Sequence, residues 1–335
     1  MQIDIIGGSL SGLATAISVK ETNPDLEVIV HEKYPKIGFN HEGRRCGEAH
    51  SVEDLWGRFI PKGDSICNVI TKGEIYCGKK KYEYGRVPNT AFMLNRPEFI
   101  AQLGREAEEI GVEIRTHDKV ESVFDLDADF IVDASGCPSC VKRELGIDLG
   151  IVGMTYQQTL VDSNCFEENV IKLYFMGEFG YYWVFPRRPE LKEVNVGMGF
   201  YGQYRNYCMK EMLNDFMRDH DIEGKVDYVT GGLIPSGLQR PLMKNNILFV
   251  GDSGVGSFPL TGQGIYRALL SGEVAGKLLA KNQAKRYPAK MYELFLKWHL
   301  IGIAFNRFND VLRHVSPNLV FKTTDFFLGL GASTH

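Results

Sequence analysis

The pattern of apolar and polar positions divides the chain into stretches with different predicted structure. Short apolar runs at Ile3–Ile6, Leu26–Val30 and Ile247–Val250 predict buried strands. The first and the last lead directly into a glycine, and Glu32 follows the second after one residue. From about Gly153 to Leu238 the pattern becomes a succession of strands with one helix. This order predicts an α/β fold in which a Rossmann-like sheet adjoins an antiparallel sheet.

The second sheet is predicted to carry an aromatic wall. Its expected strands are 153–160, 170–175, 181–185, 194–200 and 226–229, with a helix at 208–219. Aromatic residues are concentrated in this part of the chain, far above the 11% of the whole sequence. Tyr181, Trp183 and Phe185 alternate along one strand and therefore share one face. Such a wall suits a long apolar ligand, and a cross-strand aromatic core is the alternative.

The C-terminal part is predicted to be helical. Met291, Leu294, Phe295, Trp298 and Ile301 recur at helical spacing. Lysine and arginine exceed acidic residues between positions 281 and 322, although the whole chain carries a net charge of −4. This basic excess and the apolar triplet at 326–328 favour contact with an anionic membrane surface. A helix packed on the protein with solvated lysines explains the pattern equally well.

Composition restricts the class of protein. The net charge of −4 and the pI near 6.1 argue against a general nucleic-acid binder. No apolar run approaches about 18 residues, so no spanning helix is expected, and no secretory leader is recognised at the start. Seven cysteines, an odd number, fit a reducing compartment. We therefore expect a cytosolic protein of 335 residues with a large core.

The N-terminal stretch predicts a dinucleotide site. The first strand leads into Gly7, Gly8 and Gly12, which open a helix, and the second strand ends at Glu32. Glycines at this point let a pyrophosphate approach the backbone, and the acid is placed to accept the ribose hydroxyls. Ser9 departs from the pattern, because the middle position is usually glycine.

A second ligand-binding stretch follows the strand at Ile247–Val250. Asp252 lies at the carboxyl end of that strand, where open α/β sheets hold their ligands. Pro259, Gly262 and Gly264 predict a tight turn with bare backbone N–H groups before a helix. A carboxylate beside such a turn is typical of a site for a polyol and an anion or an electron-rich ring.

This stretch resembles the second flavin-binding motif of the p-hydroxybenzoate hydroxylase-like flavoproteins. The segment Leu94–Phe99 is similar to the one in which that group's arginine, here Arg96, reaches the cofactor. These resemblances favour FAD over a nicotinamide cofactor. At the middle motif, however, Ser135 replaces the usual aspartate and Asp133 a glycine. That departure weakens an NADPH-dependent hydroxylase and leaves the electron donor open.

Two further motifs resemble the archaeal-type geranylgeranyl reductases within the same superfamily. Arg45-Cys46-Gly47-Glu48-Ala49 matches their R-C-[AG]-E-[GA] segment, and residues 181–186 with 197–199 match Y-x-W-x-F-P…G-x-G, across a slightly longer gap. Flanking arginines favour a reactive thiolate at Cys46, which is a candidate proton donor or redox partner. A small residue packed under the cofactor is the alternative reading of Cys46.

The resemblance implies a set of site residues and domain limits. It makes Cys46 and Tyr181 candidate catalytic residues. The implied substrate contacts are Tyr181, Trp183, Phe185 and Pro259. The implied FAD-binding residues are Gly7, Gly8, Ser11, Gly12, Leu13, Glu32, Arg45, Cys46, Gly47, Ala49, Arg96, Val120, Ala134, Gly136, Asp252, Gly262, Gly264 and Ile265. The expected domains are 1–60, 88–150 and 240–285 for FAD, 61–87 and 151–239 for substrate, and 286–335 as a helical region.

The implied activity is hydride transfer from reduced FAD to isoprenoid C=C bonds. The expected substrate is a digeranylgeranylglycerol phospholipid or geranylgeranyl diphosphate, and the donor is NAD(P)H or a ferredoxin-like protein. A flavin monooxygenase or halogenase acting on an aromatic substrate is the first alternative. A non-redox cyclase that needs reduced flavin and an electron carrier without a small substrate are the others. Cys137 and Cys140 have redox-motif spacing, but two small residues packing a turn is the favoured reading, and no metal site is expected.

Overall fold

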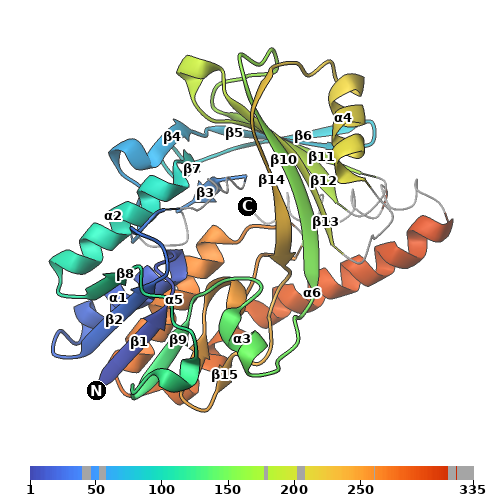
Figure 1. The fold of residues 1–335 in the computed structure, drawn as a ribbon. Coiled ribbons are helices and arrows are strands. Elements are labelled where there is room, and N and C mark those ends of the chain that lie inside the picture. Colours follow the sequence, from blue (N-terminus) through green and yellow to red (C-terminus); the bar gives the residue numbers. More distant parts are fainter. Residues whose placement is uncertain are drawn as a thin grey trace.

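The computed structural model describes residues 1–39, 47–52, 58–176, 180–201, 208–259, 261–315 and 322. Two sheets form the framework, and helices pack around them (Figure 1). The arrangement confirms the predicted α/β class with a Rossmann-like sheet beside a mainly antiparallel one.

The first sheet has six strands in the order β15-β16-β9-β1-β2-β8. All neighbours are parallel except the β15–β16 pair. The strands are β1 (Gln2–Ile6), β2 (Glu27–Glu32), β8 (Glu113–Thr116), β9 (Phe130–Asp133), β15 (Met243–Lys244) and β16 (Ile247–Phe249). The helices of this half are α1 (Leu10–Thr22), α2 (Arg96–Glu109), α3 (Cys140–Glu144) and α5 (Ile265–Ala280). Because β16 pairs with β9, the late stretch around Asp252 lies at the same sheet edge as the N-terminal loop.

Helices α1 and α5 pack backbone to backbone. A Cβ atom added at Gly272 would lie 2.3 Å from the Ser11 carbonyl oxygen, and one at Gly276 would lie 2.5 Å from that of Thr15. Only glycine permits this approach. The pair therefore fixes α5, and the turn before it, against the start of α1.

The second sheet has seven strands in the order β14-β10-β13-β12-β11-β5-β6. Only the β5–β11 pair is parallel. The strands are β5 (Lys72–Cys77), β6 (Lys80–Gly85), β10 (Val152–Val161), β11 (Val170–Phe175), β12 (Tyr181–Pro186), β13 (Val194–Tyr201) and β14 (Lys225–Pro235). Strand β14 is longer than the predicted 226–229, because Gly231 and Gly232 continue the pairing with β10 although they interrupt the apolar pattern.

Smaller elements connect and cover the two sheets. A three-stranded sheet, β3-β7-β4, lies beside α2, and α4 (Met209–Asp219) packs on the outer face of the second sheet (Figure 1). The long helix α6 (Tyr287–Val315) runs past both halves. The small strands are β3 (Ala49–Ser51), β4 (Ile66–Val69) and β7 (Ala91–Leu94).

A charge cluster around the buried His31 ties three segments of the first sheet together. His31 on β2 places Nδ1 2.8 Å from the Asp118 carboxylate and Nε2 3.5 Å from that of Asp4 on β1. Burial alone would lower the pKa of His31, but the contacts with the two carboxylates outweigh it and raise that pKa. The cluster neighbours Glu32, the predicted ribose acid.

The predicted membrane contact falls partly on α6. No helix within the described residues is long and apolar enough to cross a bilayer. On α6, Trp298, Leu300, Phe308 and Val311 are exposed. The apolar triplet at 326–328 lies outside the described residues.

Candidate active site

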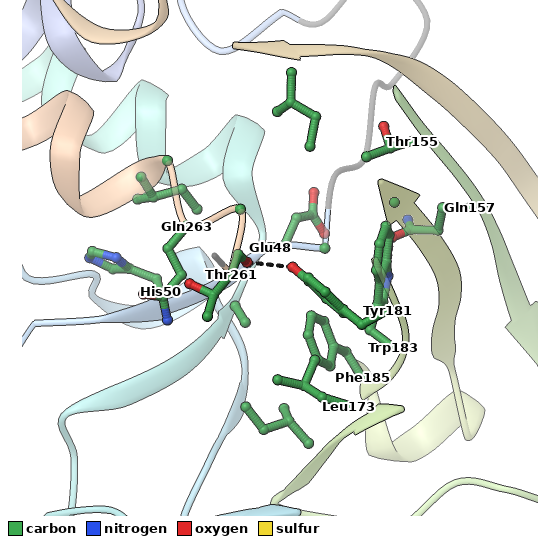
Figure 2. Close-up of a pocket in the computed structure, with 18 of the residues that line it drawn as sticks. Glu48, His50, Thr155, Gln157, Leu173, Tyr181, Trp183, Phe185, Thr261 and Gln263 are labelled. Carbon is green, nitrogen blue, oxygen red and sulfur yellow. Dashed lines mark hydrogen bonds between the residues drawn. The ribbon is translucent and has the colours of Figure 1, made fainter. Parts of the chain in front are cut away.

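A cavity of about 850 Å³ opens between the two sheets. One wall is the second sheet, and the opposite wall comes from the glycine turn before α5, from β3 and from the residues after β9. Figure 2 shows Tyr181, Trp183 and Phe185 on one side and Thr261 and Gln263 on the other. The predicted aromatic wall therefore faces the predicted flavin turn.

The aromatic wall is held flat by glycines on the neighbouring strand. Trp183 pairs directly with Gly197, and a Cβ atom added there would lie 2.4 Å from the indole ring. The indole Nε1 donates to the Gln157 side-chain oxygen at 3.0 Å. The G-x-G half of the motif thus exists because the tryptophan lies across it, and Gln157 satisfies the buried indole N–H.

Tyr181 spans the cavity. Its hydroxyl donates a hydrogen bond to the backbone carbonyl of Thr261, in the turn of the opposite wall (Figure 2). The neighbouring Thr261 hydroxyl is buried and has no hydrogen-bond partner among the described residues. The candidate catalytic tyrosine therefore reaches the place where the turn meets the cavity.

The turn and Asp252 form the cofactor side of the cavity. Asp252, Arg96, Gly262, Gly264 and Ile265 all line it. The Asp252 carboxylate makes no hydrogen bond or ion pair with a described residue. Burial raises its pKa, although positive charge from Arg96 opposes that effect. A desolvated carboxylate of this kind needs a donor, such as ligand hydroxyls.

The N-terminal loop explains its own departure from the glycine pattern. Ser9 is the N-cap of α1: its hydroxyl accepts from the Gly12 amide at 3.3 Å and donates to the Ala134 carbonyl at 3.1 Å. Glu32 accepts from the Gly8 amide at 2.9 Å. Gly7, at φ 106°, packs against Ala134, where a Cβ atom would lie 2.8 Å from the carbonyl oxygen. The loop is preorganised, with the serine replacing a glycine as a cap.

The structure brings some other predicted residues to the cavity. Gly47 and Ala49 line it, and Gly136, at φ 90°, precedes Cys137, which also lines it. Arg45 and Cys46 lie outside the described residues.

Several predicted residues lie elsewhere. The Leu13 side chain is fully buried in the core, and Ser11 is buried where α1 meets α5. Val120 packs beside the small cluster around Ile6, outside the main cavity. Pro259 packs against α6, where a Cβ atom at Gly302 would lie 2.1 Å from it. Pro259 is not among the residues that line the cavity, because α6 covers it.

The middle motif has become structural. Asp133 is fully buried, and it accepts hydrogen bonds from the hydroxyls of Ser135 and Ser139. Ser135 is the residue that replaces the usual aspartate of the motif, and Ser139 follows it in the same segment. Burial raises the pKa of Cys137 to about 11, with Asp252 adding to the effect, so this residue is a neutral thiol. Cys137 and Cys140 are both free. No metal-binding cluster is present among the described residues.

Sequence reasoning missed a buried ion cluster at the cavity wall, of which Glu48 lines the cavity. Arg187 Nε lies 2.9 Å from the Glu48 carboxylate and Nη1 lies 3.0 Å from that of Glu193. All three side chains are almost fully buried. Asn195 adds a long contact, 3.5 Å, to the Gly47 carbonyl. The cluster therefore joins the segment around Gly47 to the β12–β13 hairpin.

His50 was also missed. It lines the cavity near Gln263, is buried, and neither ring nitrogen has a hydrogen-bond partner among the described residues (Figure 2). Burial lowers its pKa to about 4, so the ring is neutral. Together with Asp252 and Thr261, it leaves three polar groups in the cavity that a polar cofactor would satisfy.

Known proteins resemble this chain in sequence and fold. The family model of the geranylgeranyl reductase catalytic domain matches residues 152–233, which hold the aromatic wall and its glycines. This part of the chain is similar to the catalytic domain of the geranylgeranyl reductases. The match agrees with the flavin-dependent oxidoreductase that the sequence predicts.

Proteins named as reductases are similar to this chain over most of its length. A digeranylgeranylglycerophospholipid reductase of Methanocella arvoryzae is 29% identical over 82% of this chain and 76% of its own length. That of Methanopyrus kandleri, reductase 2, is 27% identical over 84% and 78%. The structure of a geranylgeranyl bacteriochlorophyll reductase-like protein from Thermoplasma acidophilum has a TM-score of 0.83 at 22% identity, covering 97% of this chain and 90% of that one. The flavin-dependent brominase Bmp2 shares the fold, with a TM-score of 0.67.

Proposed function

We propose that this protein is an FAD-dependent reductase that saturates C=C bonds in the geranylgeranyl chains of a membrane lipid or its diphosphate precursor. The observation that carries the proposal is the aromatic wall of Tyr181, Trp183 and Phe185 facing the turn at Thr261–Gly264 across one cavity. The names of the matched relatives support the lipid substrate.

FAD fits the residues present. Asp252, in the cavity lining, would accept hydrogen bonds from the ribityl hydroxyls, and Glu32, at the end of β2, would accept them from the adenosine ribose. The N-terminus of α1 favours the pyrophosphate, because its first amides and helix dipole are positive. Arg96 and the amides near Gly264 complete the set. FAD, when bound, supplies the hydride, and the protein supplies position and electrostatics.

The substrate wall excludes water and orients the chain. Ile171, Leu173 and Phe185 line the cavity beside Trp183, so burial of isoprenoid carbon gains roughly 0.8 kcal/mol per methylene-sized group. The faces of the aromatic rings stabilise positive charge that develops on a double bond. The Tyr181 hydroxyl, which donates a hydrogen bond to the Thr261 carbonyl, is the candidate proton donor to the double bond among the described residues. Cys46 is the second candidate donor.

The proposal also includes an electron donor and a contact with the membrane that holds the lipid. The donor is NAD(P)H or a ferredoxin-like protein. The exposed apolar side chains of α6, Trp298 and Phe308 among them, support peripheral contact with a membrane surface, because water-exposed aromatic side chains favour the interface.

The test is single-turnover reduction. Purified protein loaded with FAD is reduced with dithionite without oxygen and mixed with geranylgeranyl diphosphate or a digeranylgeranyl phospholipid, and the lipid is weighed by mass spectrometry. We expect products heavier by one hydrogen pair per saturated bond, and loss of product in Trp183→Ala. Unchanged lipid, with peroxide released on admitting oxygen and NADPH, would instead support a monooxygenase.

A further inference from the structure

The cavity extends across the whole second sheet. Every one of the seven strands from β14 to β6 contributes to its lining. Six spacings of about 4.8 Å put its two ends roughly 29 Å apart along the sheet. The turn before α5 meets the middle of this wall, where Tyr181 on β12 reaches Thr261. The cavity therefore has an arm on each side of the reaction point, one toward β6 and one toward β14.

The β6 arm ends in a tyrosine and an arginine. Tyr84 lies flat over β5, since a Cβ atom at Gly73 would be 2.0 Å from its ring. The Arg86 guanidinium carbon is 5.2 Å from the centroid of that ring. Burial raises the pKa of Tyr84, and Arg86 opposes the effect. Arg86 is half-buried and its neighbours Gly85 and Val87 are exposed, so this end is close to solvent.

Arg86 is the basic residue that lines the substrate side of the cavity in the described part of the chain. Among the described residues that line the cavity, Arg96 and Asp252 lie on the cofactor side, and Glu48 is paired with Arg187. His50 is neutral.

Two lysines of the same hairpin form ion pairs outside the cavity. Lys72 and Lys81 pair with Glu74 and Glu83, and neither lysine lines the cavity. Arg86, one residue after β6, is the basic residue of this described hairpin that lines the cavity.

The β14 arm is apolar and open. Leu233 and Val229 line it and are 43% and 46% exposed, because β14 is the edge strand of the sheet. Phe305 of α6 faces the same cavity. An apolar chain can continue along this edge, but a desolvated phosphate would find no cation on β14 within the described lining.

We infer that the cavity holds its substrate in one direction, with a phosphate or diphosphate head at Arg86 and Tyr84 and the distal end of the chain at β14. The inference rests on the proposed function. It assigns Arg86 and Tyr84 as the site that recognises the anionic head, because a guanidinium and a phenol together offer phosphate oxygens several charge-assisted donors. The double bonds between head and tail then pass the aromatic wall in order.

The test compares a charged ligand with its neutral counterpart. Geranylgeranyl diphosphate and geranylgeraniol are titrated into oxidised holoenzyme, and binding is followed by the change in the flavin absorption spectrum, which requires no turnover. Arg86→Gln should weaken binding of the diphosphate about 10–100-fold and that of the alcohol less than about 2-fold. Lys79→Gln, at the turn of the same hairpin, should change neither. An excess of inorganic phosphate should compete with the diphosphate in wild type only weakly, because the chain supplies most of the affinity.

Direction is tested at the other end. Leu233→Trp narrows the β14 arm. It should weaken the binding of geranylgeranyl diphosphate but leave the binding of the shorter geranyl diphosphate unchanged, because that chain ends before β14. If both are weakened equally, the head binds at β14 and the inference is wrong.

Two more outcomes would overturn the inference. If Arg86→Gln weakens the binding of the diphosphate and of the alcohol equally, Arg86 has a structural role and does not recognise the head group. If it lowers the affinity for FAD, Arg86 belongs to the cofactor site. Failure of the proposed function is a different result: it appears as wild-type protein that binds these ligands with the expected charge dependence yet reduces none of them.

Discussion

Replacing Arg187 by methionine should destabilise the protein more than replacing any exposed arginine. The change introduces an unbranched apolar side chain and removes the positive charge between Glu48 and Glu193, whose carboxylates lie 2.9 and 3.0 Å from the guanidinium. Arg187 is only 2% exposed, so solvent cannot take over its role. Two carboxylates would remain buried, with Arg188 reaching one of them at 3.7 Å.

The expected loss follows from the burial of the pair. Removing one partner of a buried ion pair costs about 3–5 kcal/mol, because the remaining charge is desolvated without compensation. With about 2.1 cal/mol/K of unfolding entropy per residue over 335 residues, this lowers Tm by roughly 4–7 °C. The segment around Gly47 should loosen too, so FAD affinity should fall.

The assay is thermal unfolding of the holoprotein, followed by circular dichroism and by release of flavin fluorescence. Arg218→Met is the matched control, because Arg218 is 71% exposed and pairs with the exposed Asp215. It should cost about 0.5 kcal/mol or less. The reasoning is refuted if the two variants unfold at the same temperature. Adding Glu48→Gln and Glu193→Gln to Arg187→Met should recover part of the loss, since neutral amides cost less to bury.

Three further changes test other parts of the structure. Asp252→Asn should weaken FAD binding about 10–100-fold in a fluorescence titration, because a charged acceptor for the ribityl hydroxyls is lost; unchanged affinity would remove Asp252 from the site. Gly197→Ala should cost about 1–3 kcal/mol in denaturant unfolding, because its methyl group would meet Trp183 at 2.4 Å, whereas Gly232→Ala, with open space around it, should not. The raised pKa of His31 adds stability that is fully present below its unfolded value of 6.5 and is lost as pH rises through the folded value. The deficit of His31→Gln should therefore be larger at about pH 6 than at about pH 9, and a deficit that grows with pH would reverse the assignment.

Local patterns made much of the fold predictable. The strands around Ile5, Val30 and Leu248 were readable because parallel strands buried on both faces are continuously apolar. Asp252 was identifiable because it directly follows such a strand. Trp183 was assigned to one face because side chains in a strand alternate.

Features that depend on distant neighbours were not predictable. Arg187 looks like a surface residue in a polar hairpin, and only the fold brings Glu48 beside it. Gly272 and Gly276 interrupt an apolar helix for a reason that appears only when α1 is present. A family resemblance indicates which sequence positions bind ligand, but it does not show what packs on them in this chain. Pro259 was chosen as a substrate contact in this way, and α6 covers it.

The placement of β16 has a consequence for biosynthesis. Strand β16 completes the first sheet beside β9, and α5 supplies the surface on which α1 rests, yet both are encoded after the entire second sheet. During translation the N-terminal strands must therefore wait, with α1 uncovered, until about residue 280 has left the ribosome. Shortened chains that stop before that point should aggregate instead of yielding an independent nucleotide-binding fragment.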